Sequence, residues 1–453
     1  MILCRLGEVA RAVGGELRGD PELGLSGVAV DSREVRSGDL FFALPGERTD
    51  GHLHLRESAE RGARAAVVSR AEVLPPSLPA VVVEDTRKAL GLLAAWHRRK
   101  FPVEVIGITG SVGKTTTKDL LSQVLARRWP ILSTEGNLNT DVGLPLTLFR
   151  LQPHHRYAVL EMAMRAPGEI RWLCQISLPR YGVITRIAPV HLETLGSMEA
   201  IVRAKGELLE SLPPEGAAFL NSSDPWQEAM AALAPCPLLW YGRGERASVR
   251  AREVREDEEG LSFILVLEGE EWPVRMKHLA GHHVEAALGA AAVARHLGLP
   301  GEEIAFGLEG AVLSPLRWEV REKEGVRLVF DCYNASPEAV KAALRSLSAW
   351  RRGRRFAVLG GMLELGPLTE AAHLEVGEEA ARTGLEELVV VGELGELIAR
   401  GASRAGFPPE RVFRARDARE AASFLRPRLR EGDAVLVKGS RLLRLEEMEE
   451  GLS

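Results

Sequence analysis

One stretch of ten residues constrains the fold of this chain more than any other. Residues 107–116 read GITGSVGKTT and lie between an apolar run, VEVIGIT, and a helical run, TTKDLLSQVLARR. Glycines let backbone N–H groups close around a phosphate, and the start of a helix adds partial positive charge. In open parallel sheets, ligands bind beyond the carboxyl ends of the strands. The stretch therefore predicts an α/β domain with a nucleotide site.

Several residues of this loop have separate predicted roles. Lys114 reaches the terminal phosphates, and the Thr115 hydroxyl suits Mg²⁺. The spacing departs from the strict GxxxxGKT pattern, because Ile108 occupies the first glycine position. The alternative is a glycine-rich turn with a solvent-exposed lysine. The residues expected to surround the phosphates are Gly110, Ser111, Gly113, Lys114, Thr115 and Thr116.

The rest of the chain predicts the domain organisation. Short apolar runs alternate with helical runs after residue 103, in two series separated by a break near GAVLSPLR. This alternation is typical of parallel sheets covered by helices. We expect three α/β domains: a small mixed N-terminal domain (1–85), a central P-loop-type domain with a mostly parallel sheet (86–313) and a C-terminal Rossmann-like domain (314–453).

Composition excludes several classes of protein. The 453 residues carry a net charge of −5, so no overall basic field attracts nucleic acid. No run of about 18 apolar residues exists, so no segment is expected to span a membrane. The N-terminus lacks a signal-peptide core, and the four cysteines are scattered without a CxxC pair. We therefore expect a cytoplasmic protein with reduced thiols.

Lysine is scarce in this chain, with 9 Lys against 49 Arg, so each remaining lysine amine is of interest. Lys205 lies in the helical run SMEAIVRAKGELLESL, where Ile201, Val202, Leu208 and Leu209 share its face. Burial in such an apolar stripe lowers the pKa of an amine, and a neutral amine can condense with CO₂ to form a carbamate. The alternative is a lysine that extends along the stripe to solvent.

Two further residues are candidate metal ligands. Glu161 ends the apolar run YAVL, and a carboxylate at the end of a buried strand favours a cation. His191 follows the apolar run GVITRI, and near a phosphate loop its ring nitrogen could complete a divalent site. The alternatives are a salt bridge for Glu161 and a structural role for His191.

Together these motifs resemble the Mur ligase family, the ATP-dependent amide-forming enzymes of peptidoglycan synthesis. DSREVRSGDLFFALPGERTDGH is similar to the family's UDP-binding domain and GITGSVGKTTTK to its ATP loop. The central motifs of the family resemble GNLNTDVGLPLTL, LEMAMRAPGEI and TRIAPVHLETLGSMEAIVRAKGEL. In the third domain, DCYNASPEAV, LGGMLELG and VKGSR resemble the member that adds D-alanyl-D-alanine, and the DNPR-type motif of the diaminopimelate-adding relative is absent.

The resemblance implies a ligase that joins D-alanyl-D-alanine to UDP-N-acetylmuramoyl-tripeptide through an acyl phosphate, with ATP and Mg²⁺, for which a monomer suffices. It implies that Lys114, His191 and Lys205 are catalytic, and that Thr115, Glu161, His191 and carbamylated Lys205 form the metal site. The implied ATP contacts outside the loop are His283, Arg317, Asp331 and Tyr333. The implied substrate contacts are Ser32, Arg33, Asn137, Asn334 and Glu364.

Two departures from the family pattern concern the adenine and dipeptide pockets. An HNxxN motif reads His282-His283-Val284-Glu285-Ala286, so both asparagines are missing, and LGDMLELG reads LGGMLELG. Other functions therefore stay open. They are a diaminopimelate- or lysine-adding ligase of the same family, a P-loop ATPase or phosphotransferase, and a non-catalytic relative that binds a UDP-sugar as a regulatory partner.

Overall fold

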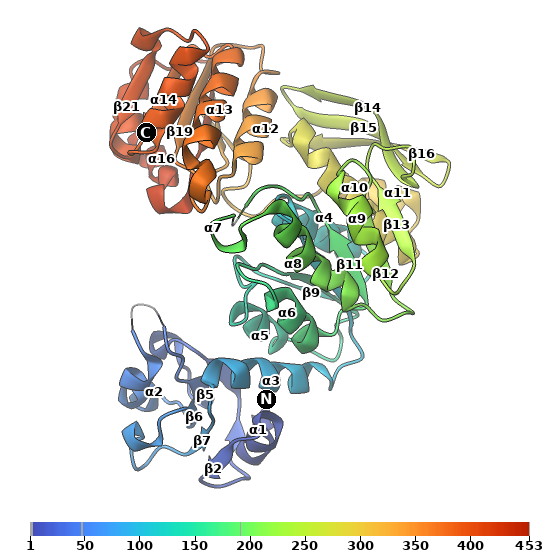
Figure 1. Cartoon of the computed structure of the whole chain (residues 1–453), viewed down its shortest axis with the longest axis vertical. Coiled ribbons are helices and arrows are strands. Elements are labelled where there is room, and N and C mark those ends of the chain that lie inside the picture. The colour runs from blue at the N-terminus through green and yellow to red at the C-terminus, as the bar shows by residue number, and fades with distance from the viewer. Residues whose placement is uncertain (1–2, 47–48, 191, 453) are drawn as a thin grey trace. The chain divides into compact units, whose positions relative to one another are not determined.

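The computed structural model describes residues 3–46, 49–190 and 192–452. The chain divides into two compact units, the first made of residues 1–107, 130–164 and 168–180 and the second of residues 108–129, 165–167 and 181–453. Helices alternate with strands in separate sheets, so the predicted α/β class is confirmed (Figure 1). The residue boundaries of the three expected domains stay predictions. No helix within the described ranges is long and apolar enough to cross a membrane.

The N-terminal sheet has the strand order β2-β7-β6-β5-β4, and each neighbouring pair is parallel except β2–β7. Strands β5 and β6 are buried along their whole length, and their residues are apolar except Asp39, whose carboxylate accepts a hydrogen bond from the Arg36 N–H. The carboxylate of Asp85 accepts hydrogen bonds from the N–H groups of Arg87 and Lys88 and so begins helix α3. The elements are β1 (Cys4–Arg5), α1 (Leu6–Val13), β2 (Glu16–Arg18), β3 (Gly24–Leu25), β4 (Gly27–Ala29), β5 (Asp39–Phe42), α2 (Leu55–Glu60), β6 (Ala65–Val68), β7 (Ala80–Val82) and α3 (Thr86–Arg98).

The largest sheet has the strand order β16-β15-β14-β13-β12-β11-β8-β10-β9. The pairs β9–β10, β11–β12 and β12–β13 are parallel, as predicted for the central domain. Strands β10, β11 and β12 are buried throughout, so they read as short apolar runs without polar alternation. The strands are β8 (Glu104–Thr109), β9 (Ile131–Ser133), β10 (Tyr157–Glu161), β11 (Tyr181–Ile184), β12 (Ala217–Asn221), β13 (Leu238–Tyr241), β14 (Val249–Asp257), β15 (Gly260–Leu267) and β16 (Glu270–Lys277).

Helices accompany these strands, and α4 and α10 pack directly against each other. Helix α10 is rich in alanine and buried on most of its surface, because it lies between α4 and the strands β12 and β13. The helices are α4 (Lys114–Ala126), α5 (Gly143–Leu148), α6 (Glu169–Ser177), α7 (Leu192–Leu195), α8 (Met198–Glu210), α9 (Trp226–Met230), α10 (Val284–His296) and α11 (Gly301–Glu309).

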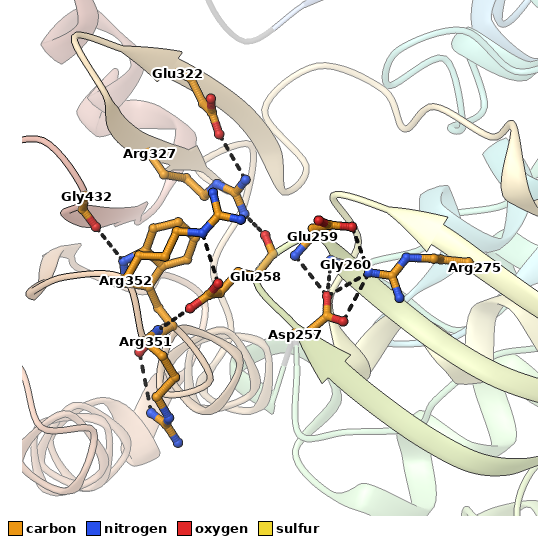
Figure 2. Close-up of polar contacts among 11 residues, drawn as sticks. Asp257, Glu258, Glu259, Gly260, Arg275, Glu322, Arg327, Arg351, Arg352 and Gly432 are labelled. Atoms are coloured by element: carbon orange, nitrogen blue, oxygen red, sulfur yellow. Dashed lines mark hydrogen bonds and ion pairs between the residues drawn. The ribbon is translucent and has the colours of Figure 1, made fainter.

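Strands β14, β15 and β16 form an antiparallel meander at one edge of this sheet. The outer two strands carry many charged residues on their exposed faces, which interrupts their apolar sequence pattern. The turn between β14 and β15 is acidic, and Figure 2 shows Arg275 of β16 directed towards it. The Arg275 guanidinium lies 3.0 Å from the carboxylates of both Asp257 and Glu259.

The third acidic residue of this turn, Glu258, points to the other side, towards the C-terminal sheet (Figure 2). Its carboxylate accepts hydrogen bonds from the N–H of Arg351 (3.1 Å) and from Nε of Arg352 (2.9 Å). Its carbonyl accepts a hydrogen bond from the guanidinium of Arg327. The turn therefore connects the meander to the C-terminal domain through charge-assisted hydrogen bonds.

The C-terminal sheet has the strand order β17-β18-β22-β19-β20-β21, and every pair is parallel except β17–β18. Phe356 and Val358 of β19 face a core that α15 and α16 cover, while α12 packs against β22. The predicted Rossmann-like architecture is therefore present. The elements are β17 (Glu319–Lys323), β18 (Val326–Phe330), α12 (Pro337–Leu347), β19 (Arg355–Gly360), α13 (Thr369–Arg382), β20 (Glu387–Val391), α14 (Gly395–Arg404), β21 (Val412–Ala415), α15 (Ala418–Leu425), β22 (Ala434–Lys438) and α16 (Met448–Gly451).

Candidate active site

The glycine-rich loop lies where the sequence predicts it, between the end of β8 and the first turn of α4. Gly113 has a φ of 89° and precedes the first helical residue, a backbone geometry that glycine adopts without strain. A Cβ atom at Gly110 would overlap the hydroxyl of Thr185, which follows β11. The loop therefore needs glycine at both positions, as a loop that brings its backbone close to a phosphate does.

Lys114 lies over this loop as the first residue of α4. Its ammonium donates hydrogen bonds to the carbonyl oxygens of Gly110 (2.9 Å) and Ser111 (3.3 Å). Thr115 is buried beside it, and Thr116 follows on the same turn. The arrangement places one cation, one hydroxyl and the N–H groups of a helix start together, which is the donor set that a nucleoside triphosphate needs.

Ser111 has mainly a structural contact in this loop. Its N–H donates to the carbonyl of Arg186 (2.7 Å), and its hydroxyl donates to the carbonyl of Ala188 (2.9 Å). These bonds fix the loop to the residues that follow β11. The backbone shape of the loop is therefore set by a second strand end, as expected at the carboxyl edge of a parallel sheet.

In the first unit, Glu161 ends β10 with a side chain that is 2% exposed. The side-chain amide of Asn139 donates a hydrogen bond to Glu161 Oε1 at 2.8 Å, and the Glu161 N–H donates to the hydroxyl of Thr134. Asn137 is exposed, and its carbonyl accepts from the Asn139 N–H. Glu161 is thus bonded to Asn139 of this loop, and the substrate contact of Asn137 stays a prediction.

In the second unit, Lys205 lies in the middle of α8 and is only 1% exposed. The predicted apolar face is present, because Ile201, Leu208 and Leu209 are fully buried on the same helix. The lysine therefore does not extend to solvent. An amine in this surrounding is costly as a cation unless charge or hydrogen bonds compensate it.

The other predicted metal ligand, His191, lies outside the described residues. Within those described, no group of three or more His, Cys, Asp and Glu side chains is arranged to hold a metal ion. The metal ligands predicted from the sequence differ from such a cluster, because they combine a hydroxyl, one carboxylate, an imidazole and a lysine. They are Thr115, Glu161, His191 and Lys205.

The ATP-contacting residues predicted in the third domain lie close together. The Arg317 guanidinium stacks over the Tyr333 ring at 4.4 Å from its centroid. Asp331, at the end of β18, accepts a hydrogen bond from the N–H of Trp318 (3.3 Å). Asn334 is exposed, and its carbonyl accepts from the Lys438 ammonium at 3.4 Å. Arg317 and Asp331 are thus joined through one short backbone segment.

Lys438 is not among the predicted site residues, yet it lies at the centre of this group. It ends β22, is 2% exposed, and its ammonium lies 2.6 Å from Oδ2 of Asp331. The sequence signal that could have identified Lys438 as a site residue is its place at the carboxyl end of an apolar strand, in a chain with only 9 lysines.

The two histidines that replace the family's amide-bearing motif are packed within the second unit. The Nδ1 atom of His283 accepts a hydrogen bond from the Ala280 N–H (3.0 Å), and His282 Nδ1 lies 3.2 Å from the Ser346 hydroxyl. Burial lowers the pKa of His282 to about 3 and that of His283 well below its usual range. Both rings lie against Trp318, with centroids 5.0 and 6.0 Å away. Both rings are therefore neutral, and His283 lies near enough to Asp331 to feel its charge.

The predicted substrate residues at the two ends of the chain lie in loops and short turns. The Ser32 hydroxyl donates to a carboxylate oxygen of Glu57 (2.9 Å). Arg33 is largely exposed, and its hydrogen bonds lower the pKa of Asp31 to about 2. Glu364 has a left-handed backbone and lies 3.8 Å from Arg165.

Comparison with known proteins follows the same division of the chain. Family models match three consecutive segments: "Mur ligase family, catalytic domain" over residues 25–104, "Mur ligase middle domain" over 108–294 and "Mur ligase, glutamate ligase domain" over 316–441. The three segments together span most of the chain between residues 25 and 441.

Individual proteins resemble the chain over nearly its whole length. The UDP-N-acetylmuramoyl-tripeptide–D-alanyl-D-alanine ligase of Bacillus subtilis (strain 168) is 35% identical, covering 94% of this chain and 92% of its own. A crystal structure of MurF from Acinetobacter baumannii has a TM-score of 0.91 at 31% identity, covering 99% and 98% of the two chains. The MurF ligase of Thermotoga maritima, in complex with ADP, has a TM-score of 0.84 at 31% identity, covering 94% and 96%.

Proposed function

The chain belongs to the Mur ligase family, and from that membership we propose that it joins D-alanyl-D-alanine to UDP-N-acetylmuramoyl-tripeptide while ATP is converted to ADP and phosphate. The protein is an ATP-dependent ligase of peptidoglycan precursor synthesis. The observation that carries this function is the full-length likeness to ligases that are named for this reaction. Because its substrates are water-soluble nucleotides and a dipeptide, we place the reaction in the cytoplasm.

The reaction has two steps. A carboxylate oxygen of the tripeptide attacks the γ-phosphorus of ATP, a new P–O bond forms, and ADP leaves. The amine of D-alanyl-D-alanine then attacks the acyl carbon, the C–O bond to phosphate breaks, and the amine loses a proton as the amide forms. Both steps bring anions together, so the protein must neutralise charge and orient the reactants.

The loop that begins α4 supplies the groups for the first step. The Lys114 ammonium would move from the carbonyl oxygens it contacts to the β- and γ-phosphates, where it stabilises charge on the transferring group. Gly110, Gly113 and Thr116 would offer backbone N–H groups, and Ser111, whose N–H is bonded to the Arg186 carbonyl, would hold the loop in shape. The glycines support this role, since a Cβ at Gly110 would overlap the Thr185 hydroxyl and both glycines have positive φ angles, which glycine adopts without strain.

Mg²⁺ fits the oxygen donors among these residues, since hydroxyl and carboxylate oxygens are hard ligands, and an imidazole nitrogen can complete the set. Thr115, Glu161 and His191 would hold it, and it would neutralise charge on the terminal phosphates. The burial of Glu161 supports this assignment, because a buried carboxylate requires compensation.

Lys205 would act in this proposal as a carbamate. The neutral amine attacks CO₂, an N–C bond forms, and one proton passes from nitrogen to water. The product is an anion, which suits a position near a divalent cation better than an ammonium does. The nearly complete burial of Lys205 supports this proposal, because the side chain stays inside the protein instead of reaching solvent.

The C-terminal domain would bind the nucleotide from a second side and receive the dipeptide. Arg317, Asp331, Tyr333 and His283 would contact ATP, while Asn334 and Glu364 would contact the incoming dipeptide. At the other end of the substrate, Ser32 and Arg33 would lie near the uridine, and Asn137 near the reacting carboxylate. Binding of three ligands by separate domains implies closure around them.

A phosphate-release assay with different amines tests the function. With UDP-N-acetylmuramoyl-tripeptide and ATP, we expect release to depend on D-alanyl-D-alanine and the product to contain a pentapeptide by mass spectrometry. Release with diaminopimelate or lysine and a shorter acceptor would instead indicate another ligase of the family. Release without any amine would indicate an ATPase, and binding of the UDP-sugar without release would indicate a non-catalytic relative.

A further inference from the structure

The segment that connects the central and C-terminal domains, residues 310–318, is attached to the helix that begins with the phosphate loop. The side-chain amide of Gln123 on α4 pairs with both backbone groups of Val312. Its Oε1 accepts from the Val312 N–H at 2.8 Å, and its Nε2 donates to the Val312 carbonyl at 2.6 Å. The Val312 side chain itself is 75% exposed, so the contact is made by the backbone.

One turn nearer the phosphate loop, Asp119 makes a second attachment. Its Oδ2 accepts from the Ser314 N–H (2.8 Å) and its Oδ1 accepts from the Ser314 hydroxyl (3.0 Å). Asp119 is 7% exposed, and the Lys118 ammonium lies 2.5 Å from it. Hydrogen bonds to a buried carboxylate are stronger than neutral ones. Residues four apart share one face of a helix, so Asp119 and Gln123 act on the segment together.

Beyond Ser314 the connecting segment has an unusual backbone. Leu316 and Trp318, on either side of Arg317, both have left-handed φ angles, 62° and 54°. Such angles are uncommon for bulky residues and persist only where the surroundings fix them. Here the Leu316 N–H donates to the Glu319 carboxylate (2.9 Å), and the Leu316 carbonyl accepts from the Tyr333 N–H (3.1 Å). The direction of Arg317 is therefore set by the backbone.

We propose that Asp119 and Gln123 are positioning residues that fix Arg317 relative to the phosphate loop. They act through Ser314 and Val312, and the anchoring helix α4 carries Lys114 and Thr115 in its first turn. A helix rises about 1.5 Å per residue, so Asp119 is roughly one turn from those groups. Arg317 and the phosphate loop are thus both held by helix α4. This inference rests on the proposed function, in which Arg317 contacts ATP.

The test compares the attachment in two backgrounds. Ser314→Ala removes the hydroxyl hydrogen bond to Asp119, and Gln123→Ala removes both hydrogen bonds to Val312. Neither substitution changes the buried ion pair of Lys118 and Asp119. We expect kcat of dipeptide-dependent phosphate release to fall on the order of tenfold with a much smaller change in KM for ATP, because a displaced charge affects the transition state more than binding. In an Arg317→Ala background, the same double substitution should change kcat by less than about twofold, since the group it positions is gone.

A matched control and a stability measurement complete the test. Arg128→Ala, just beyond the end of α4, removes an ion pair with Glu303 and no contact with the connecting segment, and should leave kcat unchanged. Unfolding midpoints in both backgrounds report any general loss of stability.

Each outcome has one meaning. An equal loss of kcat in both backgrounds, or no loss in the parent background, overturns the positioning role. Normal activity of Arg317→Ala overturns both the positioning role and the ATP contact, while leaving the ligase function intact. Absence of dipeptide-dependent release in the unmodified protein overturns the proposed function itself.

Discussion

The ammonium of Lys438 lies 2.6 Å from the carboxylate of Asp331, where Lys438 ends β22 and Asp331 directly follows the neighbouring parallel strand β18. The lysine also donates to the carbonyl oxygens of Asp331 (3.1 Å) and Asn334 (3.4 Å). A second oxygen of Asp331 accepts from the Trp318 N–H, next to Arg317. The pair therefore orients a carboxylate that we assign to the nucleotide site.

Lys438→Met should destabilise the protein strongly. The substitution leaves the Asp331 carboxylate without its cation in a largely buried place, and breaking a buried pair costs about 3 kcal/mol or more. Denaturant unfolding measures the change, with Lys277→Met, an exposed lysine, as the matched control. Adding Asp331→Asn to Lys438→Met should recover part of the lost stability but not the activity. Equal stability of the single and double variants would contradict this account.

Lys114→Ala should abolish phosphoryl transfer while the fold is retained. One positive donor of the first turn of α4 is lost, and loss of one such donor lowers the rate on the order of 10²–10³-fold. Phosphate release measures the activity, and circular dichroism with a thermal unfolding curve checks the fold. Turnover near that of the parent would refute the ATP-site assignment.

Lys205→Ala should be nearly inactive, because the carbamate anion is lost. A small carboxylate such as acetate should restore part of the activity by filling the space of the missing side chain. Lys205→Arg should fail as well, since a guanidinium stays charged and does not form this carbamate. Full activity of the Arg variant, or activity indifferent to rigorous removal of CO₂, would exclude the carbamate. So would a density map showing a bare lysine with Mg²⁺ and nucleotide bound.

Selectivity for adenine should be weaker, or based on other groups, than in relatives with asparagine on the adenine-side helix. Asparagine both donates to and accepts from a base edge, whereas Ala286 does neither. The Nδ1 atom of His283 is already bonded to Ala280, which leaves one ring nitrogen. We would compare kcat/KM for ATP and GTP in the parent, in His283→Ala and in His283→Asn. A strong ATP preference that is unchanged in His283→Ala would show that other groups read the base.

The stability of the first unit should fall as the pH is lowered from about 6.5 to about 4. His97 is 4% exposed, it packs against Phe101 and Phe149, and neither ring nitrogen has a hydrogen-bond partner in the described ranges. Burial, together with the charge of Lys100, lowers the pKa of His97 from 6.5 to about 4. Between these pH values the unfolded chain binds a proton that the folded protein does not, so acid favours unfolding.

His97→Phe tests this pH dependence. The variant cannot titrate, so its free energy of unfolding relative to the parent should rise by about 2 kcal/mol when the pH is lowered from 8 to 5. Denaturant unfolding at both pH values measures the difference, in which the contributions of His282 and His283 cancel. A difference that does not change with pH would show that His97 titrates normally.

Local patterns in the sequence were sufficient to locate most strands and helices. The glycine-rich loop lies between β8 and α4 as predicted, because an apolar run, the glycines and the start of a helical run are all short-range features. The apolar face around Lys205 was equally visible, since residues three and four apart on a helix share a side whatever the helix packs against. The spacing left open whether that lysine is buried or extends to solvent, and the structure shows that it is buried.

The antiparallel meander of β14–β16, and which of two asparagines contacts Glu161, were harder to predict from the sequence. Strands β14 and β16 carry charged residues on exposed faces, so their apolar signal is interrupted. Asn137 and Asn139 lie in the same short loop, and only the three-dimensional path of that loop shows that Asn139 reaches Glu161 at 2.8 Å. Sequence pattern identifies a ligand loop, but side-chain direction within it depends on backbone angles that the pattern does not specify.

The sequence by itself determined the elements, the α/β class and the phosphate loop, because each depends on residues close together in the chain. Tertiary structure alone decided which strand ends are neighbours. Asp331 and Lys438 meet because the last strand, β22, inserts between β18 and β19, and Asp119 meets Ser314 because the connecting segment runs along α4. Such contacts join residues more than a hundred positions apart, and their formation depends on strand order and packing, which periodicity along the chain does not encode.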